Sequence, residues 1–151
     1  MDGLEVILET PEWGSMLHEI APRAVSQTLL YLGFETGGDV AILGCDDAKI
    51  SQLNKAFRGK DTPTNVLSWP AAVLAPGDPP EPELGDIAIA YETCVREAAQ
   101  QGKAMEDHVT HLLVHATLHL LGFDHENDAE AAQMEQVEVA VLGKLGLDDP
   151  Y

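Results

Sequence analysis

The stretch His115-Ala-Thr-Leu-His119-Leu-Leu-Gly122-Phe-Asp-His125 combines three histidines with a glycine that can end a helix. His115 and His119 are four residues apart, so on a helix their side chains project from one face, one turn apart. Gly122 lets the chain leave the helix in a left-handed conformation, after which His125 can return toward the other two. Three imidazoles leave a fourth ligand position open for water, which is typical of catalytic zinc. The stretch therefore predicts a three-histidine metal site.

Two more histidines, His108 and His111, extend the same helical face toward its N-terminus. A solvated face is the simpler interpretation for both, and we expect His108 at the surface and His111 at most in contact with a ligand histidine. The spacing H-x-x-x-H-x-x-G-x-x-H also occurs in metzincin proteases, where a glutamate base follows the first histidine. Here Ala116 stands in that position and cannot accept a proton, so the pattern keeps the metal geometry without the proteolytic base.

Outward from this stretch, apolar runs and their boundaries predict alternating strands and helices. The proline-rich segment 71–84 is predicted to be a surface loop. Asp46 and Asp47 lie where the N-cap of a helix belongs, and Asn127 with Glu130 three residues on has a capping-box pattern. This order predicts a single α+β domain over residues 1–151, with a mixed four-stranded sheet packed with about five helices. The predicted strands are 4–8, 40–43, 66–69 and 86–90, and the predicted helices are 13–31, 47–57, 92–101, 105–121 and 128–145.

Composition narrows the class of protein but names no activity. The chain has 151 residues, is 45% hydrophobic, and carries 8 Lys+Arg against 26 Asp+Glu, for a net charge of −18. It is too apolar to be disordered overall, and too acidic to bind nucleic acid over its whole surface. The two cysteines have no ligand-like spacing and predict no disulfide framework. We see no signal peptide or apolar segment long enough to span a bilayer, and expect a cytoplasmic protein.

Three blocks together resemble the YbeY family of metal-dependent endoribonucleases, also described as ribosomal RNA maturation factors. The family pattern H-G-x-L-H-L-x-G-Y-D-H corresponds to His115–His125, and L-G-D-I corresponds to Leu84–Ile87. The third pattern, L-N-x-x-[FY]-R-x-x-D-x-P-T-D-V-L-S-F, corresponds to Leu53-Asn54-Lys-Ala-Phe57-Arg58-Gly-Lys-Asp61-Thr-Pro63-Thr64-Asn65-Val66-Leu67-Ser68-Trp69. The blocks occur in the family's order, and the resemblance covers most of the chain from about residue 40 to 145. The chain departs from the patterns at Ala116 (Gly), Phe123 (Tyr), Asn65 (Asp) and Trp69 (Phe).

The resemblance implies a single-strand-specific endoribonuclease that acts in rRNA maturation, including 16S rRNA 3′ end processing, and in ribosome quality control. A metal-activated water would attack the phosphodiester, and Arg58 would be the catalytic residue that binds phosphate, since its guanidinium matches phosphate oxygens. One Zn²⁺ per chain is expected at His115, His119 and His125. The expected partners are single-stranded RNA and the small ribosomal subunit or a ribosomal protein, with neither DNA nor a membrane.

Charge distribution adds an argument that does not depend on the resemblance. Residues 49–60 hold four of the eight basic residues and no acid. We interpret Lys55, Arg58 and Lys60 as a local phosphate-binding patch, although an arginine near a helix C-terminus is favourable by itself. Elsewhere the acidic surface should repel RNA, so binding should be weak without another component.

Several alternatives remain open at this level. Imidazole also suits nickel, copper and iron. His111 and Asp124 are predicted to contact the ligand histidines, while Asp61, Asp86 and Asp124 are weak candidates for a general base. A non-catalytic metal-binding assembly factor would dock a basic partner on an acidic face, and a metal-dependent peptide hydrolase is disfavoured by Ala116. That acidic face comprises Glu126, Asp128, Glu130, Glu135 and Glu138.

Overall fold

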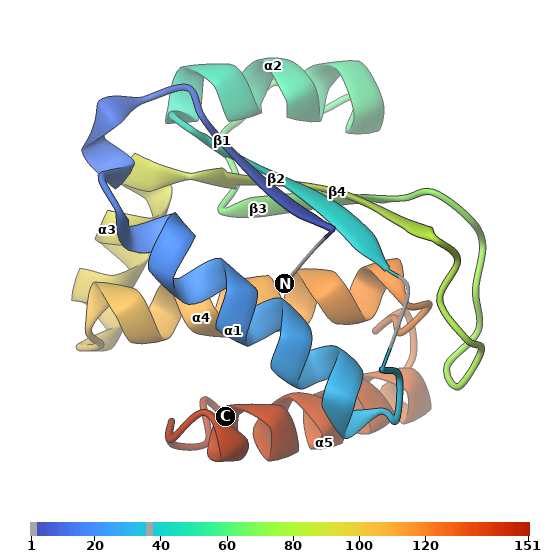
Figure 1. Ribbon diagram of the computed structural model, residues 1–151. Helices are drawn as coiled ribbons and strands as arrows, with labels where there is room; N and C mark the ends of the chain where they lie inside the picture. The colour runs from blue at the N-terminus through green and yellow to red at the C-terminus, as the bar shows by residue number, and fades with distance from the viewer. Residues whose placement is uncertain (1–2, 36–37) are drawn as a thin grey trace.

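A four-stranded sheet lies at the centre of the computed structural model, which describes residues 3–35 and 38–151 (Figure 1). Its spatial order is β1-β2-β4-β3. β1, β2 and β4 are parallel, and β3 runs antiparallel to β4 at one edge. The sheet is therefore mixed, as the sequence predicts. The strands are β1 (Leu4–Leu8), β2 (Asp39–Cys45), β3 (Val66–Pro70) and β4 (Glu83–Ala90).

The helices lie on both faces of this sheet (Figure 1). α2 covers one face, α1 and α4 lie against the other, and α5 forms a further layer beyond them. Within the described residues, five α-helices and a mixed four-stranded sheet confirm the predicted α+β fold. None of these helices has the length and apolar character needed to cross a membrane. They are α1 (Met16–Tyr31), α2 (Asp47–Arg58), α3 (Tyr91–Gln101), α4 (Met105–Leu120) and α5 (Asp128–Lys144).

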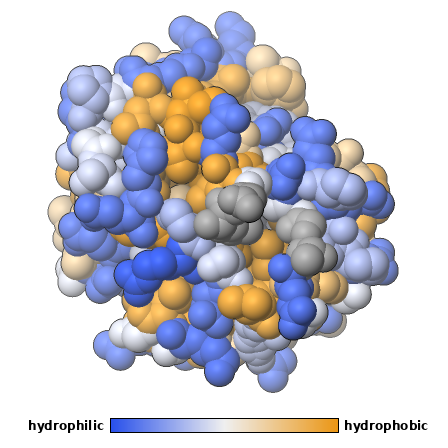
Figure 2. All heavy atoms as spheres, viewed as in Figure 1, coloured by the Kyte–Doolittle hydropathy of each residue, from blue (hydrophilic) through white to orange (hydrophobic). Residues whose placement is uncertain are grey.

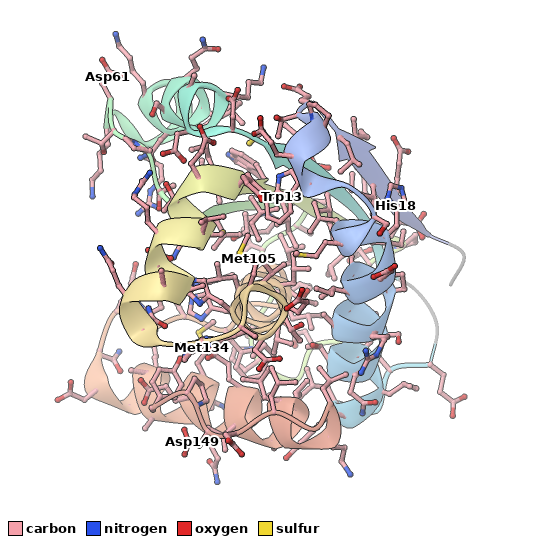
Figure 3. All side chains as sticks on the ribbon, turned by 90° about the vertical axis from the view of Figure 1, so that its left-hand side faces the viewer. Trp13, His18, Asp61, Met105, Met134 and Asp149 are labelled. Atoms are coloured by element: carbon pink, nitrogen blue, oxygen red, sulfur yellow. The ribbon has the colours of Figure 1, made fainter. Side chains whose placement is uncertain are left out.

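The core forms between the sheet and the inner helices. Ile87 and Ile89 of β4, and Leu113 and Leu118 of α4, are buried almost completely. Because α4 is enclosed by the sheet, α1 and α5, most of its surface is apolar. Figure 3, in which α4 is seen end-on, shows Trp13 and Met134 in the interior on opposite sides of it. A buried central helix of this kind gives its polar residues a fixed position.

The segment predicted as one helix over 13–31 is interrupted in the structure. A short 3-10 helix, η1 (Pro11–Trp13), precedes α1, and Gly14 between them has a φ of 55°. This left-handed conformation cannot continue a right-handed helix. The break turns Trp13 inward, where its indole N–H donates to the Cys45 carbonyl at 3.1 Å. The predicted start of this helix was therefore wrong, whereas its end at Tyr31 was right.

The structure places one N-cap at Asp46, the first of the two predicted aspartates, and confirms the other at Asn127. Asp46 accepts a hydrogen bond from the Lys49 backbone N–H at 2.8 Å and begins α2. Asn127 accepts from the Glu130 backbone N–H at 2.9 Å, and its own amide donates to the Glu130 carboxylate at 2.8 Å. This reciprocal pair begins α5 directly after the segment that carries His125.

Candidate metal centre

The turn after α4 returns the chain toward the helix it has just left. Gly122 has a φ of 98°, its N–H donates to the His119 carbonyl, and the Phe123 N–H donates to the Leu118 carbonyl, both at 3.0 Å. A Cβ on Gly122 would lie 2.2 Å from the carbonyl oxygen of Leu74 in the proline-rich loop. Glycine is thus required at residue 122 both by the backbone angle and by this close approach.

The turn brings the three predicted histidines together. His115, His119 and His125 each offer a ring nitrogen, and these nitrogens lie within 4.8 Å of one another. The Nε2 atoms of His115 and His119 are 3.1 Å apart. Two nitrogens bound tetrahedrally to one zinc ion at about 2.0–2.1 Å would be about 3.3 Å apart. The spacing of these donors therefore fits a single transition-metal ion.

The protonation state of His119 also suits a metal ligand. The pKa of His119 is lowered to about 4, chiefly by burial and then by the neighbouring His115 and His125, against a smaller opposing effect of Asp124. The imidazole is therefore neutral near pH 7 and has a lone pair to offer. Metal ions bind the neutral form of histidine.

A carboxylate that the sequence did not single out as a site residue fixes the orientation of His115. Glu138 of α5 is fully buried, and one of its oxygens accepts a hydrogen bond from Nδ1 of His115. The other oxygen accepts from Nε2 of His111 at 3.0 Å and from the Tyr151 hydroxyl. With its proton on Nδ1, His115 directs the lone pair of Nε2 toward the other two histidines. Carboxylates commonly orient metal-binding histidines in this way.

These hydrogen bonds also decide the charge of Glu138. Burial alone would raise its pKa, but the bonds from His111, His115 and Tyr151 outweigh burial and hold the pKa at about 2. The side chain is therefore ionised over the physiological range. A buried negative charge next to the histidines favours a cation among them.

The assignment of Glu138 to an exposed acidic face was wrong. Glu126, Asp128 and Glu135 are exposed, whereas Glu138 faces the core. The sequence carried a signal for this, because Glu138 lies four residues after Met134 and three and four before Val141 and Leu142, all of which are buried. A glutamate in the apolar stripe of a helix requires a buried partner.

His108 is likewise buried rather than at the surface, with only 3% of its area exposed. Its Nε2 pairs with a Glu97 oxygen at 2.9 Å, and that oxygen also accepts from the Asn65 side-chain amide at 3.0 Å. The prediction of an exposed His108 failed because α3 and β3 both pack against α4. Asn65, where the family pattern has aspartate, can donate to Glu97, which a carboxylate could not do.

Of the three aspartates considered as bases, only Asp124 lies beside the histidines. It lines their cavity and accepts a hydrogen bond from the His125 backbone N–H at 2.8 Å. Asp61 is exposed and points away from the molecule beyond the end of α2 (Figure 3), 3.9 Å from the Lys55 ammonium. Asp86 is exposed on β4 and borders a separate groove. Asp61 and Asp86 therefore lie outside the cavity that contains the histidines.

The three histidines line a cavity of about 860 Å³ together with Arg58. Arg58 is the last residue of α2, and Gly59, with a φ of 72°, caps the helix. The loop that follows is held by Asn54, whose buried amide donates to the Thr62 carbonyl at 2.9 Å. Lys55 and Lys60 are exposed and do not line the cavity. The structure thus joins two distant sequence blocks in one cavity, with Arg58 as its cationic side chain.

The chain matches the family model described as Endoribonuclease YbeY over residues 9–146. Curated relatives with the name Endoribonuclease YbeY include those of Dinoroseobacter shibae, 52% identical over 98% of this chain and 90% of the relative, and Ruegeria pomeroyi, 51% identical over 98% and 97%. A relative of the same name from Bartonella quintana is 44% identical over 98% and 96%. These matches span nearly the full length of this chain and of each relative.

One solved structure shares the fold. A protein of Thermotoga maritima, determined in solution, superimposes with a TM-score of 0.57 and 20% sequence identity over 97% of each chain. At this identity the likeness concerns the fold alone. It supports the arrangement of helices and strands around the centre.

Proposed function

This chain belongs to the YbeY endoribonuclease family, and we propose that it hydrolyses phosphodiester bonds of single-stranded RNA with one metal ion at His115, His119 and His125. The observation that carries the proposal is that the three histidines and Arg58 line one and the same cavity of about 860 Å³. A metal site and a guanidinium facing one cavity provide what phosphodiester hydrolysis requires, namely activation of water and stabilisation of phosphate charge.

Each side chain has a definite task in this reaction. When bound, a divalent metal ion supplies a Lewis acid that activates water and polarises a phosphoryl oxygen. Glu138 holds His115 in the tautomer that leaves Nε2 free for the ion. Arg58 binds the non-bridging phosphate oxygens and stabilises the negative charge that grows on them, because its planar fork matches their spacing.

The residue that follows His115 bears on the type of substrate. Ala116 is buried and lines the cavity, so no carboxylate occupies the position of the metzincin base. This supports a phosphodiester over a peptide as the substrate. Zinc is the ion we propose, because tetrahedral sites of three histidines favour it, and nickel, copper and iron are the competing ions.

We further propose that the RNA is ribosomal, with processing of the 16S rRNA 3′ end and ribosome quality control as the biological context. The net charge of −18 supports a role for a partner, because an acidic protein binds RNA weakly without one. The small ribosomal subunit or one of its basic proteins, in the cytoplasm, would supply that attraction. Lys55 and Lys60 would then contact phosphates of the RNA strand next to the one that Arg58 binds.

Cleavage of end-labelled single-stranded RNA tests the proposal. The zinc-loaded protein should cleave, chelation should abolish cleavage, and added zinc should restore it. His119→Ala should be inactive, and Arg58→Ala should lose about 100- to 1,000-fold in rate, as expected when one charge-stabilising donor is removed. Arg23→Ala, which removes an exposed arginine on α1, serves as the matched control. Cleavage that persists in both His119→Ala and Arg58→Ala would contradict the proposal.

An assembly factor without catalysis is the second candidate, and the exposed acidic residues of the α5 region favour it. Glu126, Asp128 and Glu135 are exposed to solvent, and Glu126 also lines the cavity of the three histidines. In cells, a charge reversal of Asp128 and Glu135 should then impair rRNA processing while His119→Ala leaves processing intact. The opposite pattern would favour the nuclease.

A further inference from the structure

An exposed aromatic pair borders the cavity that holds the histidines. Phe57, in the last turn of α2, is 63% exposed, and Trp69 on the edge strand β3 is half-buried beside it. Their ring centroids are 5.2 Å apart, with an interplanar angle of 66°. Several large apolar side chains of this chain are exposed, and Phe57 differs from a singly exposed side chain in its contact with a second aromatic ring at the border of two depressions.

Phe57 and Trp69 line two adjoining depressions. One is the cavity of the three histidines, and the other is a groove of about 450 Å³ between α2 and the sheet. The groove is mainly apolar, with Leu43 and Leu53 in its wall and Asp86 at its border. Figure 2 shows apolar side chains reaching the surface near the sheet below α2, on a face that is otherwise largely hydrophilic. The aromatic pair therefore lies at the boundary between the metal centre and an apolar groove.

Basic residues neighbour Phe57 along the chain. Arg58 follows Phe57 directly and faces the cavity. Lys55 and Lys60 lie within three residues of Phe57, and residues 49–60 contain no acid. Asp61 offsets part of this charge through its 3.9 Å contact with Lys55. Cations next to exposed aromatic rings are the combination with which proteins bind single-stranded nucleic acids, because the cations meet phosphates and the rings stack on bases.

We propose that Phe57 and Trp69 form a stacking site for one nucleobase of the RNA strand, next to the phosphate that Arg58 binds. This inference rests on the proposed RNA-cleaving function and adds a subsite to it. A base on the aromatic pair fixes the strand relative to the metal centre, so that a phosphate one nucleotide away reaches Arg58. The site selects unpaired strands, because a base inside a duplex is already stacked on both faces. The adjoining cations favour a polyanion over an apolar protein side chain.

Trp69 provides a direct signal for stacking. The chain has two tryptophans, and Trp13 is 1% exposed and out of reach of a ligand. Zinc-loaded protein is titrated with a short single-stranded oligouridine, and separately with a ribose-phosphate chain of the same length and charge that lacks bases. The integrity of each oligonucleotide is verified on a gel after the titration. Oligouridine should quench the tryptophan fluorescence, and the abasic chain should bind more weakly without quenching.

Variants separate stacking from charge. Phe57→Leu keeps an apolar side chain but no ring, and should weaken oligouridine binding by about 5- to 150-fold, while binding of the abasic chain stays unchanged. Phe57→Tyr should restore binding. Trp69→Phe should abolish the quenching but retain most of the affinity, which assigns the signal to Trp69. Tyr31→Leu, which removes another exposed aromatic ring on α1, is the matched control and should behave as wild type.

Two results would overturn the stacking site. Equal affinity for oligouridine and the abasic chain would show that bases are not bound. Unchanged oligouridine affinity in Phe57→Leu would show that the ring of Phe57 does not stack on a base, and a protein partner would then be the expected occupant of the groove. If either result came with intact metal-dependent cleavage, only the stacking site would fail. Base-dependent quenching in a protein that does not cleave RNA would instead refute the nuclease while leaving the stacking site standing.

Discussion

Replacing Glu138 by glutamine tests how far a buried carboxylate supports the metal centre. One oxygen of Glu138 accepts from His115, and the other accepts from His111 and Tyr151. Glutamine has nearly the same shape, but an NH₂ group, which donates hydrogen bonds and cannot accept them, replaces one of the two carboxylate oxygens. Whichever way that amide points, it faces at least one donor that previously had an acceptor.

The size of the effect follows from these contacts. Glu138→Gln loses a charge-assisted hydrogen bond and leaves a buried donor without an acceptor, which together cost about 2–4 kcal/mol of unfolding free energy. His115 is then free to change tautomer or ring orientation. Loss of a residue that orients a metal ligand typically costs about 10- to 100-fold in metal affinity. We expect zinc affinity to fall within that range.

Competition with a chromophoric chelator measures the zinc affinity, and denaturant unfolding of the metal-free protein measures the stability. Glu135→Gln changes an exposed glutamate on the same helix and controls for the loss of one negative charge. Circular dichroism verifies that both variants are folded. Zinc affinity within twofold of wild type in Glu138→Gln would refute the reasoning, because His115 would then not depend on Glu138 for its orientation.

Three further perturbations test other parts of the structure. Gly122→Ala should lower the unfolding free energy by about 2–4 kcal/mol in thermal unfolding, because residue 122 has a positive φ and a Cβ there would lie 2.2 Å from a backbone oxygen. Its zinc affinity should fall as well. The control is Gly143→Ala, in an open helical position, which should be neutral or stabilising by up to about 1 kcal/mol. Asn65→Asp should cost about 1–3 kcal/mol by placing a second carboxylate beside Glu97, and adding Glu97→Gln should recover most of that loss in denaturant unfolding. In metal-free folded protein the pKa of His119 lies at about 4, below its ordinary value of 6.5. Between these two pH values the unfolded chain therefore binds one more proton than the folded protein. The unfolding free energy should fall as the pH is lowered from about 6.5 to about 4. A flat profile over that range in urea titrations would contradict the last expectation.

Much of the fold could be predicted because its signals are local. The strands follow apolar runs bounded by glycine or proline, and the Asn127 cap lies three residues before the glutamate it contacts. The grouping of His115, His119 and His125 followed from helical spacing and one glycine. Each of these patterns depends on residues within a few positions of one another, where the chain geometry leaves few choices.

The remaining features depend on distant partners. Glu138 is 23 residues from His115, and its charge is tolerated only because α5 packs against α4. His108 can be buried because a Glu97 oxygen on another helix accepts a hydrogen bond from its ring. The neighbouring Phe57 and Trp69 come from different elements, which sequence spacing cannot place in contact. The burial of Glu138 and His108 arises only when the layers assemble, so it could not be predicted from the polarity of the residues along the chain.

The contact between Gly122 and the carbonyl of Leu74 also indicates where the protein tolerates engineering. The proline-rich loop is pressed against the metal-bearing turn at Leu74, whereas Gly77 has open space around it. A peptide tag or fluorescent reporter inserted beside Gly77 would project into solvent. The same insertion beside Leu74 would lift the loop from the turn and release His125. Within this loop, labels for imaging or immobilisation should therefore be attached at the tip beside Gly77.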